Sequence, residues 1–460
     1  MTRFPRLLSL ALLAVLVLAV PAHARPNEEV TFEAPRDLFD PGKRDPAFET
    51  ISSLGVHALR VVLYWHDVAP SPDSRIGPRI DLTDPANYDW SKYQPVLDEA
   101  ARRGWTVQLT VSGPVPRWAT NGARDTLTRP SPSEFGKFVH AVAAHYGSKV
   151  DTWSIWNEPN HPQFLGPQYD SRHRPASPAV YRGLYAAALR GLAAVGDTKP
   201  VLMGETAPVG TTKDVAPLTF LRQALCLSET YKKVGKCSRL RVDGYAHHAY
   251  STRQGPYYRP ASKNFVTIGV LPRLVTALDR AARARVVKAK LPIYLTEFGV
   301  QSVPDPYYGV SYQRQNEFRA YSEQIAFNNS RVAAFSQYLL TDDLPGSGRT
   351  KYGGFESGLL TSAGKPKPAL AGFRLPVVAK IHGSKVSLWG IVRPATGPTT
   401  VIVEQHERGR AWHTLATVST NAAGVWRRSA ARGPKTREWR VRWTAPDGTE
   451  YIAPPVRALK

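Results

Sequence analysis

The segment WSIWNEPN, residues 153–160, decides how the chain folds and where its chemistry lies. An apolar run typical of a buried strand leads to Glu158 and then to Pro159, which cannot donate to a sheet ladder. The restriction that proline places on the residue before it favours an extended backbone at Glu158. An α/β barrel keeps its functional side chains at the carboxyl ends of its strands. We therefore expect Glu158 to be a catalytic acid, with a second carboxylate close to it.

Seven further β-type runs alternate with helical or loop segments on both sides of this one. The eight runs cover residues 30–34, 58–65, 106–111, 150–158, 200–205, 242–248, 292–297 and 333–340. Alternating strands and helices predict a parallel sheet with crossover helices. Eight such units in roughly 350 residues predict an α/β fold of the (β/α)8 TIM-barrel type. A doubly wound open sheet is the alternative, but no glycine-rich phosphate turn follows the first strand.

Beyond Pro376 the pattern changes to short alternating runs, such as residues 399–404 and 438–443, separated by turn signals. This sequence pattern is typical of a small all-β sandwich of the immunoglobulin or fibronectin-III type. We expect the barrel to occupy residues 25–375 and the sandwich residues 376–460. Five tryptophans of the second unit either fill its core or form a face on which sugars stack: Trp389, Trp412, Trp426, Trp439 and Trp443.

The first residues have the features of an export signal. Arg3 and Arg6 precede an apolar run over residues 7–20, and Ala-His-Ala at 22–24 offers a small-x-small cleavage site. The run is short for a membrane span, which needs roughly 20 apolar residues, and no later stretch is long enough either. We predict a signal peptide over residues 1–24 and a secreted, monomeric protein that is extracellular or associated with the cell wall.

The charge balance is strongly basic. The chain has 60 lysines and arginines against 37 acidic residues, a formal net charge of +23. For an exported protein this predicts non-specific association with anionic cell-wall polymers. We do not expect nucleic acid as a partner, because the basic residues are spread along the chain and no basic run is interleaved with aromatic residues.

Cys226 and Cys237 are the two cysteines of the chain. In an oxidising compartment a disulfide between them is expected. It would close a short loop and stabilise the fold by about 3 kcal/mol. Two cysteines are too few for a structural zinc site.

Glu297 ends the seventh predicted strand as Glu158 ends the fourth, so both should project at one end of the barrel. A pair of carboxylates is the minimum needed to cleave a glycosidic bond, and it needs neither a metal nor a cofactor. At about 5 Å and an effective dielectric constant near 20, two charged carboxylates repel by roughly 3 kcal/mol, which keeps one of them protonated. Glu205, near the end of the fifth strand, is a rival that we interpret as a sugar-binding or structural group.

Short motifs add a resemblance to a known group of enzymes. Trp-Asn-Glu-Pro at 156–159 and Thr-Glu-Phe-Gly at 296–299 resemble the signatures of glycoside hydrolase clan A, with family 39 or family 5 (cellulase-like) nearest. Other matches follow in strand order: Arg60 on strand two, Pro-Arg-Trp at 116–118, His-Ala-Tyr at 248–250, and Gly-Leu-Leu at 358–360 followed by Lys-Pro-Ala at 367–369. Each motif is weak alone, and together in the correct order they are strong.

The resemblance implies a retaining mechanism acting on a carbohydrate substrate. It makes Glu158 the acid/base and Glu297 the nucleophile. The residues that it implies bind the substrate or support the carboxylates are Asn157, Arg60, His248, Tyr250, Trp118 and Trp65. An arginine favours the charged form of a carboxylate, which suits Arg60 beside Glu297. His247 and His248 are adjacent on a strand and point to opposite faces, so only His248 should enter the site.

Two other functions remain open from the sequence. One is a non-catalytic polysaccharide-binding or cell-surface protein that keeps the barrel, and the other is a transglycosylase that uses the same covalent intermediate. The clan commonly has a tryptophan on strand eight, whereas residues 336–340 read Ser-Gln-Tyr-Leu-Leu. The sugar at the reaction centre is therefore not identified by the resemblance.

Overall fold

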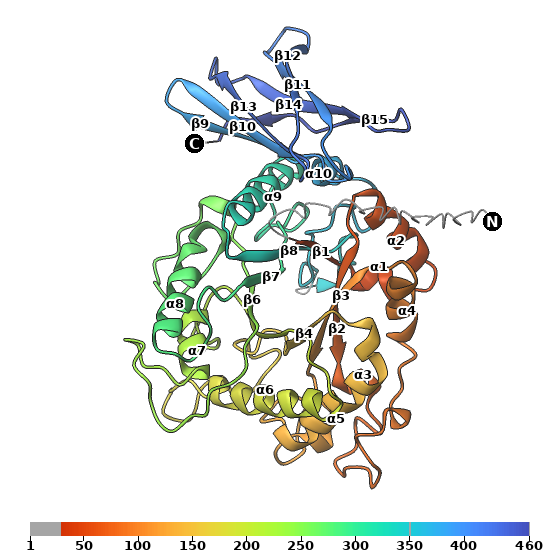
Figure 1. Ribbon diagram of the computed structural model, residues 1–460, viewed down its shortest axis with the longest axis vertical. Helices are drawn as coiled ribbons and strands as arrows, with labels where there is room; N and C mark the ends of the chain where they lie inside the picture. Colours follow the sequence, from red (N-terminus) through yellow and green to blue (C-terminus); the bar gives the residue numbers. More distant parts are fainter. Residues whose placement is uncertain (1–28, 349–350, 460) are drawn as a thin grey trace, which may run out of the picture.

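The computed structural model describes residues 29–348 and 351–459. Eight parallel strands form a closed barrel in chain order (Figure 1). They are β1 (Glu29–Glu33), β2 (Ala58–Tyr64), β3 (Thr106–Ser112), β4 (Thr152–Ile155), β5 (Val201–Thr206), β6 (Gly244–His248), β7 (Ile293–Glu297) and β8 (Val332–Tyr338). The predicted TIM barrel is confirmed and the open sheet is excluded. The predicted signal peptide lies outside the described residues.

Helices cover the outside of the barrel, so the strands are buried on both faces and have nearly continuous apolar sequences. The α-helices are α1 (Pro35–Leu38), α2 (Arg44–Ser53), α3 (Trp65–Val68), α4 (Gln94–Arg102), α5 (Pro132–Tyr146), α6 (Ser177–Ala194), α7 (Pro217–Ala224), α8 (Pro272–Arg283), α9 (Tyr312–Phe327) and α10 (Pro368–Arg374). The described residues also include the 3-10 turns η1 (Pro85–Asn87), η2 (Arg117–Ala119), η3 (Gly147–Lys149), η4 (Gly255–Tyr257) and η5 (Ile268–Val270). In the described part of the chain, no helix is both long enough and apolar enough to cross a membrane.

The backbone around Glu158 differs from the expected extended form. β4 ends at Ile155, and the φ angles of Trp156 and Glu158 are 74° and 39°. The expectation from Pro159 is wrong because neighbouring strands hold the segment in a turn: Trp156 N donates to Val111 O at 2.9 Å and Glu158 N donates to Glu205 O at 3.0 Å. A left-handed conformation costs a bulky residue about 1–3 kcal/mol, and such strain is concentrated at functional sites.

Two antiparallel sheets follow the barrel. Their strands are β9 (Val377–His382), β10 (Lys385–Ile391), β11 (Thr400–His406), β12 (His413–Ser419), β13 (Val425–Ala431), β14 (Glu438–Thr444), β15 (Glu450–Ile452) and β16 (Val456–Arg457). One sheet has the order β13-β10-β9, and the other has the order β12-β11-β14-β15 with β16 paired to β14. Side chains of both sheets, such as Leu388 and Val403, share one hydrophobic core.

The tryptophans of these sheets are mostly interior. Trp389, Trp426, Trp439 and Trp443 are 1–3% exposed. The ring of Trp412 stacks on His406 and lies under the guanidinium of Arg440. The core interpretation is therefore correct for Trp389, Trp426, Trp439 and Trp443, which are too buried to form a face for stacking sugars, whereas Trp412 is half-buried.

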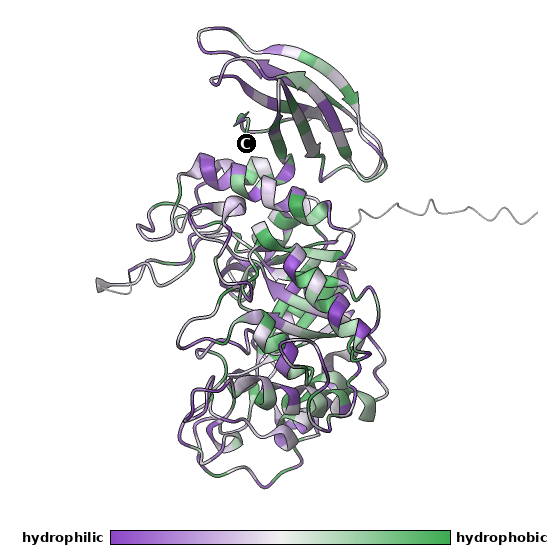
Figure 2. Ribbon diagram, turned by 90° about the vertical axis from the view of Figure 1, so that its left-hand side faces the viewer, coloured by the Kyte–Doolittle hydropathy of each residue, from purple (hydrophilic) through white to green (hydrophobic). Residues whose placement is uncertain are grey.

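The antiparallel unit packs on one side of the barrel, next to α9 and α10 (Figures 1 and 2). Val378, Trp389 and Ile391 form a buried cluster with residues of α9, among them Ala320 and Tyr321. This apolar contact attaches the second unit to the outside of the barrel.

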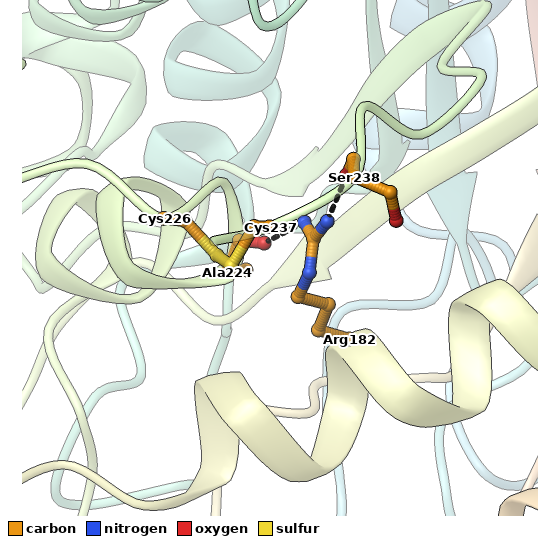
Figure 3. Close-up of a disulfide and its surroundings, with 5 residues drawn as sticks. All are labelled: Arg182, Ala224, Cys226, Cys237 and Ser238. Atoms are coloured by element: carbon orange, nitrogen blue, oxygen red, sulfur yellow. Dashed lines mark hydrogen bonds between the residues drawn. A yellow bond between two sulfur atoms is a disulfide. The ribbon is translucent and has the colours of Figure 1, made fainter. Parts of the chain in front are cut away.

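Cys226 and Cys237 form the predicted disulfide, which closes the loop that follows α7 (Figure 3). The guanidinium of Arg182, on α6, donates to Ala224 O at 2.9 Å and also to Ser238 O. Both ends of the disulfide loop are therefore tied to the same helix.

Candidate active site

Arg60, on β2, is the centre of a polar cluster inside the carboxyl end of the barrel. It is 1% exposed, and its side chain reaches acceptors carried by four other strands or the turns after them. These acceptors are Glu33 from β1, Asn157 Oδ1 at 2.8 Å from the turn after β4, Glu205 Oε2 at 2.6 Å from β5, and Glu297 Oε1 at 2.7 Å from β7. One guanidinium therefore joins five segments that are distant in sequence.

The negative charges around Arg60 outnumber the single positive charge. Burial, opposed by Arg60 and reinforced by Glu297 and Glu205, raises the pKa of Glu33 to about 8. Glu33 is therefore mostly protonated at neutral pH, which reduces the repulsion within the cluster. Burial lowers the pKa of Arg60, but attraction by Glu205, Glu33 and Glu297 outweighs it and holds that pKa well above the ordinary value.

Glu205 is an anchor for Arg60. It is the extra residue at a register shift between Gly204 and Thr206, with φ of 51°, and this bulge turns its side chain into the barrel. The carboxylate also accepts from Thr110 Oγ1 at 2.8 Å, and the residue is 0% exposed. With no surface open to a ligand, Glu205 fits the structural role rather than the sugar-binding one.

Glu158 and Glu297 lie together, as the sequence predicts. One oxygen of each carboxylate and one ring nitrogen of His248 all lie within 4.8 Å of one another. The two glutamate side chains are 15% and 11% exposed, so both remain accessible from outside. The structure therefore brings two strand-end carboxylates into a single site that solvent can reach.

The surroundings of the two glutamates differ. Glu297 accepts hydrogen bonds from Arg60 at 2.7 Å and from the hydroxyl of Tyr250 at 3.1 Å. Glu158 has a single strong contact, 2.8 Å from its Oε1 to Nδ1 of His248. Burial, with smaller opposing effects of His161 and Arg60, raises the pKa of Glu158 to about 7. Glu158 is thus a proton donor at mild pH, and Glu297 has donors that stabilise a negative charge.

The two adjacent histidines point in different directions, as predicted. His247 bonds to Thr206 Oγ1 at 2.9 Å and to Val266 O at 2.8 Å, away from the carboxylates. His248 faces Glu158 and lies 3.5 Å from Glu297. Burial lowers the pKa of His248 to about 4, so its ring is neutral at physiological pH. A neutral ring orients Glu158 through a hydrogen bond without adding a charge.

Aromatic side chains stand behind Tyr250. Its ring centroid lies 5.7 Å from Phe355 and 6.4 Å from Tyr338, and those two rings lie 5.1 Å apart. Tyr338 is the last residue of β8, the strand on which the clan commonly has a tryptophan and this sequence does not. Phe355 comes from the loop after β8 and carries no signal in the sequence, so only the fold identifies it.

The two tryptophans predicted to contact sugar have different positions. Trp118 is half-buried in η2, and its Nε1 donates to Pro70 O at 3.2 Å. Trp65 is 0% exposed and stacks on Phe138 with a centroid distance of 5.0 Å. The expectation for Trp65 is therefore corrected: it is a core residue, because its ring is packed against α5 and has no face open to a substrate.

Glu158, His248 and Glu297 are a set of donors that a metal ion could share. Glu297 already accepts from Arg60 and Tyr250, and a cation there would lie beside the guanidinium of Arg60. Electrostatics therefore disfavour a metal at this position. Metal-free and cofactor-free chemistry stays a prediction.

Comparisons with known proteins give a structural match. No protein-family model matches the chain, and no curated protein matches it in sequence. A glucosidase from Croceicoccus marinus superimposes with a TM-score of 0.53 and 11% identity, over 94% of this chain and 96% of that one. A family 39 glycoside hydrolase from the gut symbiont Bacteroides cellulosilyticus WH2 gives a TM-score of 0.53 and 16% identity, over 85% and 79%.

The chain is structurally similar to glycoside hydrolases of clan A. At these identities the likeness establishes the fold, and any activity must be argued from the residues of the site.

The protonation of Glu33 predicts how stability depends on pH. The folded-state pKa of about 8 lies above the ordinary value of 4.5, so the folded protein binds more protons than the unfolded chain between these values. The free energy of unfolding should therefore fall as the pH rises from about 5 to 8. We expect Glu33→Gln, which cannot ionise, to make this decline shallower in urea titrations at several pH values. Exposed Glu229→Gln is the control, and an equal slope in wild type and Glu33→Gln would contradict the assignment.

Proposed function

We propose that this protein is a retaining glycoside hydrolase, with Glu158 as the acid/base and Glu297 as the nucleophile. The observation that carries the proposal is the short approach of two carboxylates in unequal surroundings, with atoms within 4.8 Å. Carboxyl groups of retaining enzymes lie about 5–5.5 Å apart, whereas inverting enzymes leave about 6.5–9.5 Å for a water molecule. An approach this close between oxygens of the two groups supports direct attack by a carboxylate.

In the first step, the protonated Glu158 donates its proton to the glycosidic oxygen while a carboxylate oxygen of Glu297 attacks the anomeric carbon. The bond from that carbon to the glycosidic oxygen breaks, and the leaving group departs as an alcohol. A pKa of about 7 keeps Glu158 protonated at mild pH. Arg60 and Tyr250 hold Glu297 and stabilise its charge until the new bond forms.

In the second step, the deprotonated Glu158 takes a proton from water, and the water oxygen attacks the anomeric carbon of the glycosyl-enzyme. Glu297 leaves as a carboxylate, and two inversions give net retention. The bond from His248 Nδ1 orients Glu158 for both proton transfers. A transglycosylase would differ only in using a sugar hydroxyl in place of water.

Asn157 is placed to bind the substrate beside the reacting carbon. Its Oδ1 is occupied by Arg60 at 2.8 Å, which fixes the orientation of the amide and leaves Nδ2 as the donor for a sugar hydroxyl. Tyr250 and half-buried Trp118 are the proposed aromatic contacts to the sugar. The proposal also includes export of the mature chain, which rests on the residue pattern of the first 24 positions.

A non-catalytic carbohydrate-binding barrel is less consistent with this geometry. Two carboxylates this close repel each other, which costs free energy, and binding a sugar does not require such a pair. Nor does it require one of them to keep a proton at neutral pH. These features match the needs of acid and nucleophile catalysis.

Replacing each carboxylate separates their roles. We expect Glu297→Ala to lower kcat/KM for aryl β-glycosides by more than about 10³-fold, and azide to restore turnover with an α-glycosyl azide as product. We expect Glu158→Ala to lower kcat/KM by about 10²–10⁴-fold, with a smaller loss for substrates whose leaving group needs no protonation. Azide should then give a β-glycosyl azide. Exposed Glu229→Ala is the control, and full residual activity in either active-site variant would reject the assignment.

The pKa of Glu158 predicts the pH profile of the reaction. Because kcat/KM reports groups of the free enzyme, activity should decline above a pH of about 7, as Glu158 loses its proton. The same decline should be absent from Glu158→Ala assayed with dinitrophenyl glycosides. If the decline persists in that variant, another group supplies the proton.

A further inference from the structure

Basic residues that are separated in sequence meet at the amino end of the barrel. Residues 232–241 lead into β6 and residues 280–290 lead into β7. Parallel strands all begin at one end, so these segments lie opposite the candidate active site. The two segments contain ten cations: Lys232, Lys233, Lys236, Arg239, Arg241, Arg280, Arg283, Arg285, Lys288 and Lys290. The fold therefore gathers charge that looks dispersed along the sequence.

Two adjoining hollows lie between these segments. One is bordered by both cysteines of the disulfide, and the other is bordered by Arg241, Asp243 and Lys288. They share Arg239 and Leu240, so they form one continuous depression. We call it the basic groove, and its cationic lining residues are Arg182, Lys233, Arg239, Arg241, Arg285 and Lys288.

Most of these cations lack a counter-charge. Arg241 forms an ion pair with Asp243 at 2.8 Å, and Asp243 is the acidic residue of the lining. Across residues 29–348 and 351–459, none of the other five cations of the groove forms an ion pair with a carboxylate. Burial lowers the pKa of Arg182, whose hydrogen bonds go to backbone carbonyls. Five unneutralised cations around one depression repel each other and favour a bound polyanion.

The groove is built on a fixed frame. The disulfide closes one wall, and Arg182 joins the two ends of the closed loop through Ala224 O and Ser238 O (Figure 3). The ring of Tyr231, within that loop, lies 5.7 Å from the guanidinium of Arg222 and 5.6 Å from that of Arg280. These contacts hold the loop against α7 and α8, so little order has to be gained when a ligand binds.

We propose that the basic groove binds a linear polysaccharide that carries carboxylates, an inference that rests on the proposed glycosidase function. Arginine matches a carboxylate with two parallel hydrogen bonds, and successive carboxylates along a polymer would engage successive cations of the groove. The lining residues include no aromatic side chain on which nucleic-acid bases could stack. Docking a polymer opposite the active site would keep the enzyme concentrated near its substrate.

The test compares two triple variants of the full chain. Lys233→Ser/Arg239→Ser/Arg285→Ser removes three exposed cations of the groove, and Arg408→Ser/Arg410→Ser/Lys435→Ser removes three exposed cations of the antiparallel unit. Both lower the net charge by the same amount. We expect the groove variant to bind immobilised polygalacturonate about tenfold more weakly than wild type, and the control variant to stay within about twofold. Neutral dextran should bind neither protein.

Each other outcome would overturn the proposal. An equal loss of polygalacturonate binding in the two variants would show association through net charge alone. If the wild type does not bind, the proposed binding site is rejected. Tighter binding of polyphosphate or duplex DNA, lost in the same variant, would assign the groove to a phosphate polymer. Thermal unfolding checks that both variants are folded. Aryl-glycoside hydrolysis, expected to be unchanged in both, reports separately on the proposed function, because absent turnover with groove-dependent binding would reject the activity alone.

Discussion

A single buried guanidinium organises the carboxyl end of this barrel. Arg60 cannot lose its charge in the interior, so acceptors must surround it, and β1, β5, β7 and the turn after β4 supply them. Breaking a buried ion pair costs about 3–5 kcal/mol, because the remaining charge stays uncompensated. The position of Glu297 and the orientation of Asn157 both depend on this one contact group.

Burial then distributes the protons among the carboxylates. Glu33, deep in the cluster, has its pKa raised to about 8, and Glu158, outside the reach of Arg60's hydrogen bonds, has its pKa raised to about 7. Glu297 lies between Arg60 and Tyr250 and accepts a hydrogen bond from each. Of the two solvent-accessible glutamates, it is the one whose negative charge these donors stabilise. Burial and unequal hydrogen bonding therefore produce a carboxyl group that keeps its proton and a carboxylate supported by donors, with oxygens within 4.8 Å.

Much of this arrangement could be predicted from the sequence, because parallel strands carry their carboxyl ends to one place. Eight β-type runs predicted the barrel. Side chains at the ends of its strands were expected to lie close together, and this holds for Glu158, Glu297, His248 and Tyr250. The pairing of Arg60 with Glu297 was expected, but its contacts with Glu205 and Glu33 could not be predicted. Glu205 turns inward through a bulge, and Glu33 pairs across β1 and β2 only in the folded register. Trp65 was wrongly predicted to contact sugar. A tryptophan after a strand has the same sequence pattern whether it faces a substrate or packs against a helix.

As the proposed nucleophile, Glu297 should form a covalent bond with the substrate sugar. The most direct measurement is intact-mass and peptide analysis of the protein after incubation with an activated 2-deoxy-2-fluoro glycoside of a sugar that it hydrolyses. We expect a mass increase of one fluoroglycosyl group on the peptide that contains Glu297, and no such increase in Glu297→Gln. Labelling of Glu158 or Glu205, or continued hydrolysis without any covalent adduct, would contradict it.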